Sequence, residues 1–327
     1  MKILITGAGG YVGNRLAHTL ANRNNKVHAL VRSATASAIL QHPNITVFKG
    51  DLLDKASLSV AIKGCEQVYH TASLVKMWVK DPALLHEQNV TGTNNVLEAA
   101  LREGVQKLVY TSTCGVWGSS SGHLLTEKDA LSSSFETDYD LSKQLAEKSV
   151  TEYHLKGMPA VIVNLSRVFG PGQYRYSSGI NRFIHQLIRN KICPLPWHLE
   201  TKGNYAFMED VVEGHILAMK KGLDGERYIL GGENVSYKRF ADTVARLSGR
   251  KNITLRVPAS LLKVWSWTEL ARGKFTNHQP VIIPNIARRL QSDKAFDCSK
   301  AIEKLGYRVT PFEKAMRITI GHLQNQS

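Results

Sequence analysis

Short runs of apolar and β-branched residues alternate, over the first half of the chain, with longer segments in which apolar residues recur at helical spacing. The runs occupy residues 2–6, 26–31, 45–49, 67–71, 106–112 and 160–165. The intervening segments include amphipathic stretches at 11–23, 83–103 and 139–156. Strands that are apolar along their length are typical of parallel sheets covered on both faces, with helices as the crossovers. The pattern therefore predicts an α/β fold with a doubly wound parallel sheet.

The regular alternation ends near residue 167, and the rest of the chain is less periodic. Its clearest elements are predicted helices at 180–190 and 209–221 and a strand at 226–230. We predict that the first domain comprises residues 1–167 and that residues 204–232 return to it. A smaller C-terminal lobe is then built from residues 168–203 and 233–327.

A glycine-rich turn joins the first strand to the first helix. Gly7 permits a tight reversal, Gly10 lets the backbone approach a pyrophosphate, and Gly13 lets the helix pack against the strand. The free N–H groups at the helix start, including those of Tyr11 and Val12, then face an anion. Because the turn stands between a strand and a helix, we interpret it as a dinucleotide-binding turn rather than one without a ligand.

The ends of the next strands offer further contacts to a dinucleotide. Arg32 follows the second strand, at the place where an acid would bind the ribose and an arginine suits the 2′-phosphate. The sequence therefore favours NADP, with NAD as the alternative. Asp51, followed by Leu52, ends the third strand, where its carboxylate could bind the adenine or cap the next helix. Small side chains that let a cofactor pass closely follow the fourth strand, at Thr71, Ala72 and Ser73.

The catalytic signal is a tyrosine and a lysine four residues apart, Tyr139 and Lys143. On a helix both side chains project from one face, so the lysine charge is expected to lower the pKa of the phenol toward neutrality. Upstream, Thr111, Ser112 and Thr113 form a run of hydroxyls at the carboxyl end of the fifth strand, where ligand crevices of α/β folds open. We predict a proton shuttle at the tyrosine, with a nearby hydroxyl holding a substrate oxygen.

With these motifs in view, the sequence resembles the extended short-chain dehydrogenases/reductases, the family that includes the NAD-dependent epimerases/dehydratases. The resemblance is carried by GAGGYVG, YTST and YDLSK, and it extends through VFGPG, MEDVVEGHILAM and the segment 226–249. HTAS with NVTGTNNVLEAA is most similar to the dihydroflavonol reductase and 3β-hydroxysteroid dehydrogenase-like branch. The resemblance implies a Rossmann-type domain followed by a substrate-binding lobe.

The same resemblance implies a role for each motif residue. Tyr139 is then the acid/base, and Lys143 binds the ribose and tunes the tyrosine. Thr113 stands at the active-site hydroxyl position, with Ser112 as the fallback, and Leu165, at the end of the sixth strand, joins the cofactor-binding set.

Departures from the family pattern narrow the expected chemistry. Sugar-nucleotide dehydratases place an Asp-Glu pair after the active-site threonine, where this chain has Cys114 and Gly115, so dehydration is not expected. Many nucleotide-sugar epimerases carry an Arg-Asp pair where Gly203 and Asn204 stand in this chain. The difference weakens the prediction of a sugar-nucleotide substrate without excluding it. Three arginines remain available to a diphosphate: Arg175, Arg182 and Arg189.

Composition adds limits on location and partners. The 327 residues have a formal net charge of +15, but Lys and Arg are spread along the chain and no nucleic-acid module is visible. No apolar run approaches the ~20 residues of a membrane span, and Met1 leads directly into the first strand. The four cysteines form no CxxC pair and the histidines show no metal-ligand spacing. We expect a cytoplasmic protein with reduced thiols, without a metal; a homodimer is possible.

The sequence thus predicts an NADP-dependent reductase or dehydrogenase of a ketone/secondary-alcohol pair on a mid-sized, largely apolar small molecule. Four aromatic residues are expected around the nicotinamide: Trp78, Trp117, Phe183 and Trp197. The amphipathic segment 258–271, with Leu261, Leu262, Trp265 and Trp267, is expected to be mainly core, with a membrane or lipid contact as the alternative. The alternative functions are a nucleotide-sugar epimerase with tightly bound NAD and a non-catalytic dinucleotide-binding regulator.

Overall fold

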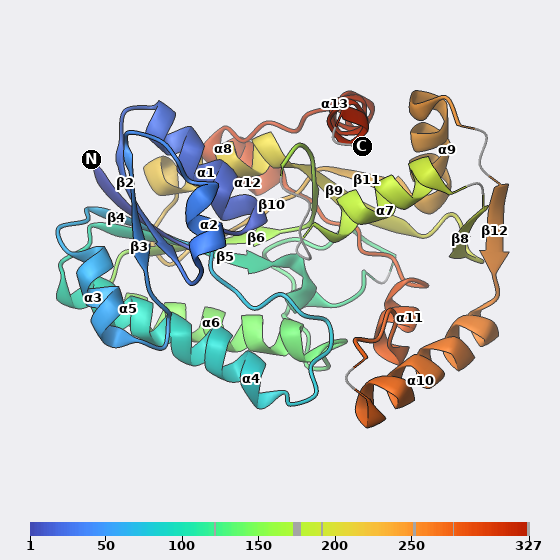
Figure 1. Ribbon diagram of the computed structural model, residues 1–327, viewed down its shortest axis with the longest axis horizontal. Helices are drawn as coiled ribbons and strands as arrows, with labels where there is room; N and C mark the ends of the chain where they lie inside the picture. The colour runs from blue at the N-terminus through green and yellow to red at the C-terminus, as the bar shows by residue number, and fades with distance from the viewer. Residues whose placement is uncertain (121, 173–177, 191, 251–252, 277, 326–327) are drawn as a thin grey trace.

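A seven-stranded parallel sheet forms the centre of the molecule (Figure 1). The computed structural model describes residues 1–120, 122–172, 178–190, 192–250, 253–276 and 278–325. The strands of the large sheet are β1 (Lys2–Thr6), β2 (Lys26–Val31), β3 (Ile45–Lys49), β4 (Gln67–His70), β5 (Lys107–Thr113), β6 (Ala160–Leu165) and β10 (Arg227–Leu230). Their order is β10-β6-β5-β4-β1-β2-β3, and every neighbouring pair is parallel. The predicted doubly wound Rossmann-type sheet is confirmed.

Helices cover both faces of this sheet. One face carries α1 (Tyr11–Asn22), α8 (Met208–Lys221) and α12 (Ser299–Leu305), and the other carries α3 (Lys55–Ile62), α5 (Gly92–Arg102) and α6 (Asp138–Leu155). A short helix, α2 (Ala34–Ala38), follows β2. Strand residues alternate between the two layers: Ile3 and Ile5 pack toward α1, whereas Leu4 packs toward α3 and α5. The continuous apolar runs in the sequence are therefore explained by burial on both sides.

The later part of the chain adds two small sheets and their helices. The first sheet has the order β11-β9-β7, with β7 (Arg167–Phe169), β9 (Lys202–Phe207) and β11 (Glu233–Ser236). It packs with α7 (Gly179–Arg189), α9 (Tyr237–Ser248) and α13 (Phe312–Asn325) around an aromatic core that includes Phe169, Tyr205, Phe240 and Phe312. The second sheet pairs β8 (Ile192–Pro196) with β12 (Ile253–Val257), near α10 (Ala259–Phe275) and α11 (Pro284–Arg289).

These pairings bear on the predicted domain division. Of the segment 204–232, α8 and β10 join the large sheet, whereas β9 pairs with β7 and β11 in the small one. The division itself stays a prediction.

Strand order reverses beside β1. From β1 the chain moves outward through β2 to β3, and it then returns to β4 on the other side of β1 and continues to β5 and β6. Such a reversal leaves a crevice at the carboxyl ends of the strands because the connections on its two sides lead away from each other. The topology therefore places a ligand crevice above the ends of β1 and β4.

The predicted helix at 83–103 is interrupted. The structure has α4 (Ala83–His86), a π-helical turn η1 (Glu87–Thr91) and then α5. Asn89 lies in the π turn, is 2% exposed, and uses its amide oxygen to accept the Leu74 N–H at 2.7 Å and its amide nitrogen to donate to Ser142 Oγ at 2.9 Å. Single π turns are frequent at functional sites, and this one lets a helix residue fasten a loop to α6.

The expectation that segment 258–271 is mainly core is wrong. Within α10 the side of Leu262 packs against Ile282 and Ala287. Trp265 and Trp267 remain 44% and 56% exposed, and Leu261 is also exposed. The buried side of the helix is one narrow stripe, and Val264 and Phe275 on its other side are exposed as well. No helix in the described part of the chain combines the length and apolarity needed to span a membrane.

Candidate active site

The glycine turn is shaped by close backbone contacts that exclude side chains. Gly7 has φ +74°, and a Cβ built on it would lie 2.6 Å from the Ala72 backbone. A Cβ on Gly13 would overlap the Gly7 carbonyl and lie 2.5 Å from Thr71 Oγ1. Gly10 is the N-cap of α1, whose first turn has no acidic residue and no side-chain cap. The first backbone N–H groups of α1 therefore face the crevice with no anion from the chain in front of them.

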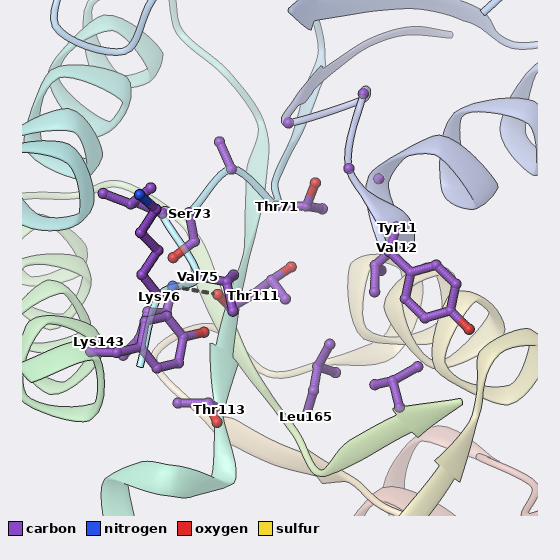
Figure 2. Close-up of a pocket in the computed structure, with 18 of the residues that line it drawn as sticks. Tyr11, Val12, Thr71, Ser73, Val75, Lys76, Thr111, Thr113, Lys143 and Leu165 are labelled. Carbon is purple, nitrogen blue, oxygen red and sulfur yellow. Dashed lines mark hydrogen bonds between the residues drawn. The ribbon is translucent and has the colours of Figure 1, made fainter. Parts of the chain in front are cut away.

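A cavity of about 750 Å³ opens at the carboxyl ends of the strands and brings most of the predicted residues together (Figure 2). Of the predicted cofactor set it is lined by Gly7, Gly10, Tyr11, Val12, Gly13, Arg32, Leu52, Thr71, Ala72, Ser73 and Leu165. In Figure 2 Tyr11 and Val12 lie on one side of this cavity, and Ser73, Lys143 and Thr113 lie on the other. The glycine turn and the expected catalytic residues therefore share one space.

Asp51 is the predicted cofactor residue that does not line this cavity. Its Oδ1 accepts the Leu53 N–H at 2.9 Å and closes a turn. The helix that follows is capped by another residue, Asp54, which accepts the N–H groups of Ala56 and Ser57. The local turn contact competes with a ligand for the Asp51 carboxylate, and an adenine contact stays a prediction.

Arg32 stands at the rim of the cavity. It follows directly after β2, is exposed, and forms no ion pair with a carboxylate among the described residues. A free guanidinium beside the glycine turn is available to a phosphate. The position fits the 2′-phosphate prediction, which it does not test.

The Lys143 ammonium is held in the interior beneath the cavity. Lys143 is 2% exposed, and its Nζ donates to the Thr111 carbonyl at 2.8 Å, the dashed line in Figure 2. The same atom lies 4.2 Å from the centre of the Tyr110 ring. Burial lowers the pKa of Lys143 to about 7, and the Glu147 carboxylate one turn later partly offsets this. These contacts fix the lysine at the end of β5.

Tyr139 lies one turn before Lys143, against the loop that follows β4. Burial, and secondarily the Asp140 carboxylate, raise the pKa of Tyr139 above its ordinary value, whereas hydrogen bonding to Ser73 and the charge of Arg289 lower it. The expectation that Lys143 brings the phenol near neutrality is therefore wrong for this cavity, because desolvation is the larger effect. The phenol is neutral and protonated, the form that can donate a proton.

Two buried amides hold the segments that contact Tyr139 and carry Thr113. Asn89 Oδ1 also accepts from Ser73 Oγ at 3.1 Å, so the π turn fixes the loop that touches Tyr139. On the other side, Asn164 Nδ2 donates to the Thr113 carbonyl at 3.2 Å and to Glu147 Oε1 at 2.6 Å. Asn164 is a polar residue inside the apolar run 160–165, which is a signal that the sequence offered, whereas Asn89 stands in the largely polar stretch 86–95.

Thr113 is the last residue of β5. Its Oγ1 accepts the Gly115 N–H at 3.1 Å, and the side chain lines the cavity. Ser112, the fallback, is also among the lining residues, but its hydroxyl is buried and lies near the Glu147 carboxylate, whose pKa it lowers. Both residues line the same cavity as the tyrosine, so the choice of Thr113 stays a prediction.

The positions at which dehydratases carry acids are closed in this chain. Cys114 is 3% exposed, and its thiol donates to the Asn164 carbonyl, away from the cavity. A Cβ on Gly115 would overlap the Asp140 carboxylate. Neither position lines the cavity, and the expectation that this protein does not catalyse dehydration stays a prediction.

The prediction that four aromatic residues surround the nicotinamide is wrong. None of the four aromatic residues lines the cavity: Trp117 packs on Phe296, Phe183 stacks on Phe240, Trp197 is exposed, and the Trp78 carbonyl accepts from Gln279. The apolar lining instead comes from loop residues and from the start of the second lobe, namely Leu74, Val75, Met77, Val168 and Ile180. Loop and lobe contacts of this kind depend on tertiary packing that local pattern does not report.

Two arginines that the sequence reading did not select line the cavity, Arg167 and Arg289. Of the three that it named for a diphosphate, Arg182 and Arg189 do not line it, and Arg175 lies outside the described residues. A Cβ on Gly203 would overlap the Arg167 guanidinium. The space beside Gly203 thus already holds an arginine head, so the missing arginine at 203 is a weaker argument against an anionic substrate than it seemed in the sequence. No cluster of described His, Cys, Asp or Glu residues could hold a metal ion.

Comparison with known proteins agrees with this geometry. Sterol demethylase protein B of Methylococcus capsulatus is 32% identical over 312 residues, which cover 94% of this chain and 93% of the relative. A putative dihydroflavonol 4-reductase of Synechocystis is 29% identical over 98% of this chain and 94% of its own. The crystal structure of a UDP-glucose 4-epimerase from Thermotoga maritima has the same fold, with a TM-score of 0.83 at 20% identity over 100% of this chain and 99% of its own. A model of the NAD dependent epimerase/dehydratase family matches residues 3–231, and the chain therefore belongs to that family.

Proposed function

We propose that this protein is an NADP-dependent oxidoreductase that interconverts a ketone and a secondary alcohol on a mid-sized, largely apolar substrate. The observation that carries the proposal is the single cavity shared by the glycine turn, Thr113, Tyr139 and Lys143. Relatives include proteins named as a dihydroflavonol 4-reductase and a 3-beta-hydroxysteroid dehydrogenase, the latter 26% identical over 94% of this chain. The apolar lining at Leu74, Val75 and Met77 suits a substrate of the same character.

The cofactor fits the residues present. Gly7 and Gly13 leave no room for side chains, and the uncapped start of α1 offers N–H groups to a pyrophosphate. Arg32 would hold the 2′-phosphate and Lys143 the ribose. When bound, the nicotinamide supplies or accepts the hydride at the carbonyl carbon.

Side chains of the protein would transfer the proton to and from the substrate oxygen. Thr113 would orient that oxygen by a hydrogen bond, and Tyr139, whose raised pKa keeps the phenol protonated, would donate a proton to it during reduction. Lys143, fixed on the Thr111 carbonyl, places a cationic or readily titrated group one helical turn away, where it stabilises the phenolate left behind. In the oxidative direction the same groups act in the opposite sense, and Tyr139 would accept the proton from the substrate hydroxyl.

A nucleotide-sugar epimerase is the second candidate. Arg167 beside Gly203 gives it one specific observation, because a guanidinium at the cavity could hold a phosphate. An epimerase would use the same hydride chemistry with NAD held through turnover.

The first prediction concerns the proton donor. Tyr139→Phe keeps the ring but removes the proton, so cofactor binding should persist while turnover falls by about 10²-fold or more. Lys143→Ala should weaken cofactor binding and lower turnover. Tyr153→Phe, on the same helix but outside the cavity, is the control and should leave turnover unchanged. Steady-state kinetics with fluorescence titration of the cofactor separates the effects, and near-normal turnover of Tyr139→Phe would exclude the mechanism.

The second prediction concerns cofactor choice. Arg32→Ala removes a charge-assisted contact to the 2′-phosphate and should weaken NADPH binding roughly 10- to 100-fold while leaving NADH nearly unchanged. Arg308→Ala, an exposed arginine that does not line the cavity, controls for the change in net charge. Equal losses for both cofactors in the Arg32 variant would reject the assignment.

The third prediction separates the two candidate functions. A panel of hydrophobic ketones, including flavonoid, steroid and alkyl ketones, should contain a substrate whose reduction consumes NADPH. Nucleoside diphosphates should not bind to the NADP-saturated protein in isothermal titration, because saturation blocks the cofactor pocket. Micromolar binding of a nucleoside diphosphate under that condition would promote the epimerase and overturn the reductase.

A further inference from the structure

The charged residues that line the cavity are all cations. They are Arg32, Lys76, Lys143, Arg167 and Arg289, and no aspartate or glutamate is among the lining residues. Two of them have roles in the proposed cofactor site: Arg32 at the 2′-phosphate and Lys143 at the ribose. The other three cations, Lys76, Arg167 and Arg289, have no role in the proposed cofactor site.

Arg289 is already neutralised by the chain. Its guanidinium lies 3.2 Å from an Asp140 oxygen and 3.6 Å from a Glu136 oxygen. Glu136 in turn pairs with Lys294 at 2.8 Å. This network ties α11 to the start of α6 and leaves Arg289 with little charge to offer a ligand.

Arg167 has no such partner. Its guanidinium donates to the Tyr205 hydroxyl at 3.1 Å and lies within 6 Å of the Tyr205 and Tyr237 rings, but it forms no ion pair with any carboxylate of the described residues. The space that it fills is kept open by Gly203. A partly buried guanidinium among aromatic rings retains a strong preference for an anion, because neutral phenol contacts do not balance its charge.

The neighbouring residue provides a second observation. Ser166 is among the residues that line the cavity, and its hydroxyl, which is covered by neighbouring atoms, has no hydrogen-bond partner among the described residues. Buried hydroxyls without partners are uncommon in folded proteins, and rotation of this side chain to another rotamer would give the hydroxyl a partner in an anion bound in the cavity. Ser166 and Arg167 stand at the junction between β6 of the large sheet and β7 of the small one, so the group lies on the substrate side of the cavity.

We propose that the substrate is a keto or hydroxy acid whose carboxylate binds to Arg167 and Ser166, an inference that rests on the proposed oxidoreductase function. A single free guanidinium matches one planar carboxylate by a two-bond fork. Of the other two cations, Arg289 is held by Asp140 and Glu136, and Lys76 offers a point charge without a planar fork. The apolar residues Val168 and Ile180 beside the arginine suit the hydrocarbon part of the acid.

The test measures binding, so that it does not depend on turnover. NADP-saturated protein is titrated with decanoate, 2-naphthoate and lithocholate, each paired with its neutral primary amide. At least one acid should bind about 10-fold or more tightly than its amide, and Arg167→Met should remove that preference. Arg167→Lys should restore part of it, since the charge returns without the fork. Arg288→Met, outside the cavity, is the charge control.

The outcomes distinguish the possibilities. If no acid binds more tightly than its amide, or the preference survives Arg167→Met in a variant whose melting temperature and NADP affinity are unchanged, the inference is overturned. Arg167-dependent binding of UDP or pyrophosphate in place of the acids would assign the site to a diphosphate and would also overturn it. Failure of the proposed function looks different: acids bind as expected, but no ketone or alcohol exchanges hydride with the cofactor.

A second inference concerns helix α10 and is independent of the cavity. Figure 1 shows α10 at the margin of the molecule. Its inner stripe of Leu262, Ser266, Glu269 and Gly273 is buried, whereas Val264 is 62% and Phe275 88% exposed. With the exposed Leu261, Trp265 and Trp267, these side chains make up what we call the outer face of α10.

The charges on α10 favour one occupant for this face. Its cations, Lys263, Arg272 and Lys274, are all exposed, whereas its one acid, Glu269, is buried and bonded to His278 and Arg272. Exposed tryptophan and aliphatic side chains bordered by lysines are typical of helices that lie in the plane of a membrane interface. The chain as a whole adds a formal charge of +15. We infer that the outer face of α10 binds the surface of an anionic lipid bilayer.

Vesicle sedimentation of the full chain tests this inference. Phosphatidylcholine vesicles with about 30% phosphatidylglycerol should bind the protein, pure phosphatidylcholine should bind it more weakly, and salt should reduce the difference. The double variant Val264→Glu/Phe275→Glu should lower the bound fraction at least about 5-fold. Leu155→Glu, an exposed apolar residue at the end of α6, is the matched control.

Size measurement by analytical ultracentrifugation supplies the other outcome. If the double variant turns a dimer into a monomer and the wild-type protein does not bind anionic vesicles, the outer face is an interface between copies of the chain, and the lipid inference is overturned. Equal vesicle binding by the wild-type protein and the double variant would overturn it as well.

Discussion

The burial of one ammonium group, that of Lys143, constrains much of the candidate site. A buried charge is tolerated only where hydrogen bonds and opposite charge compensate its desolvation. Here the Thr111 carbonyl accepts from it at 2.8 Å, the Tyr110 ring lies beneath it, and Glu147 is one turn away. The first two compensations require α6 to sit in one position against β5, whereas Glu147 is on α6 itself. Because Tyr139 is on the same helix one turn earlier, that position also sets where the phenol enters the cavity.

The compensation extends outward through polar groups. Glu147 is itself buried and lies 3.2 Å from Arg227 on β10, while its other oxygen accepts from Asn164. Burial raises the pKa of Glu147, and the Arg227 charge opposes that rise. Through Asn164 the network reaches the Thr113 carbonyl. The proposed hydroxyl and the proposed proton donor are thus held by one set of interactions, which spans three neighbouring strands and a helix.

Sequence pattern predicted the large sheet well and the second lobe poorly, for a physical reason. Strands buried on both faces give long apolar runs, so β1 through β6 were visible, with ends that differ by at most a residue. The π turn at 87–91 was not visible; its Asn89 bonds to a loop 15 residues away in sequence, a contact that no local pattern reports. The site showed the same division. The turn, the tyrosine and the lysine are local motifs, whereas Arg167 reaches the cavity only because β7 leaves the large sheet and pairs with β9.

The sequence wrongly placed four aromatic residues around the nicotinamide and did not select Arg167. Both outcomes depend on tertiary packing, and both bear on how the cavity would select a substrate. Trp117 and Phe183 are aromatic residues that the chain uses for its own cores, so their number near the catalytic motifs said nothing about the substrate. Apart from the polar residues, the cavity is instead lined by aliphatic side chains and by cations, and no aspartate or glutamate is among its lining residues. An apolar wall selects weakly between hydrocarbons, since one methylene group is worth only about 1–3 kcal/mol. A partly buried guanidinium disfavours a ligand that leaves it without an anionic partner, so in the proposed site Arg167 would discriminate between substrates more strongly than the apolar wall.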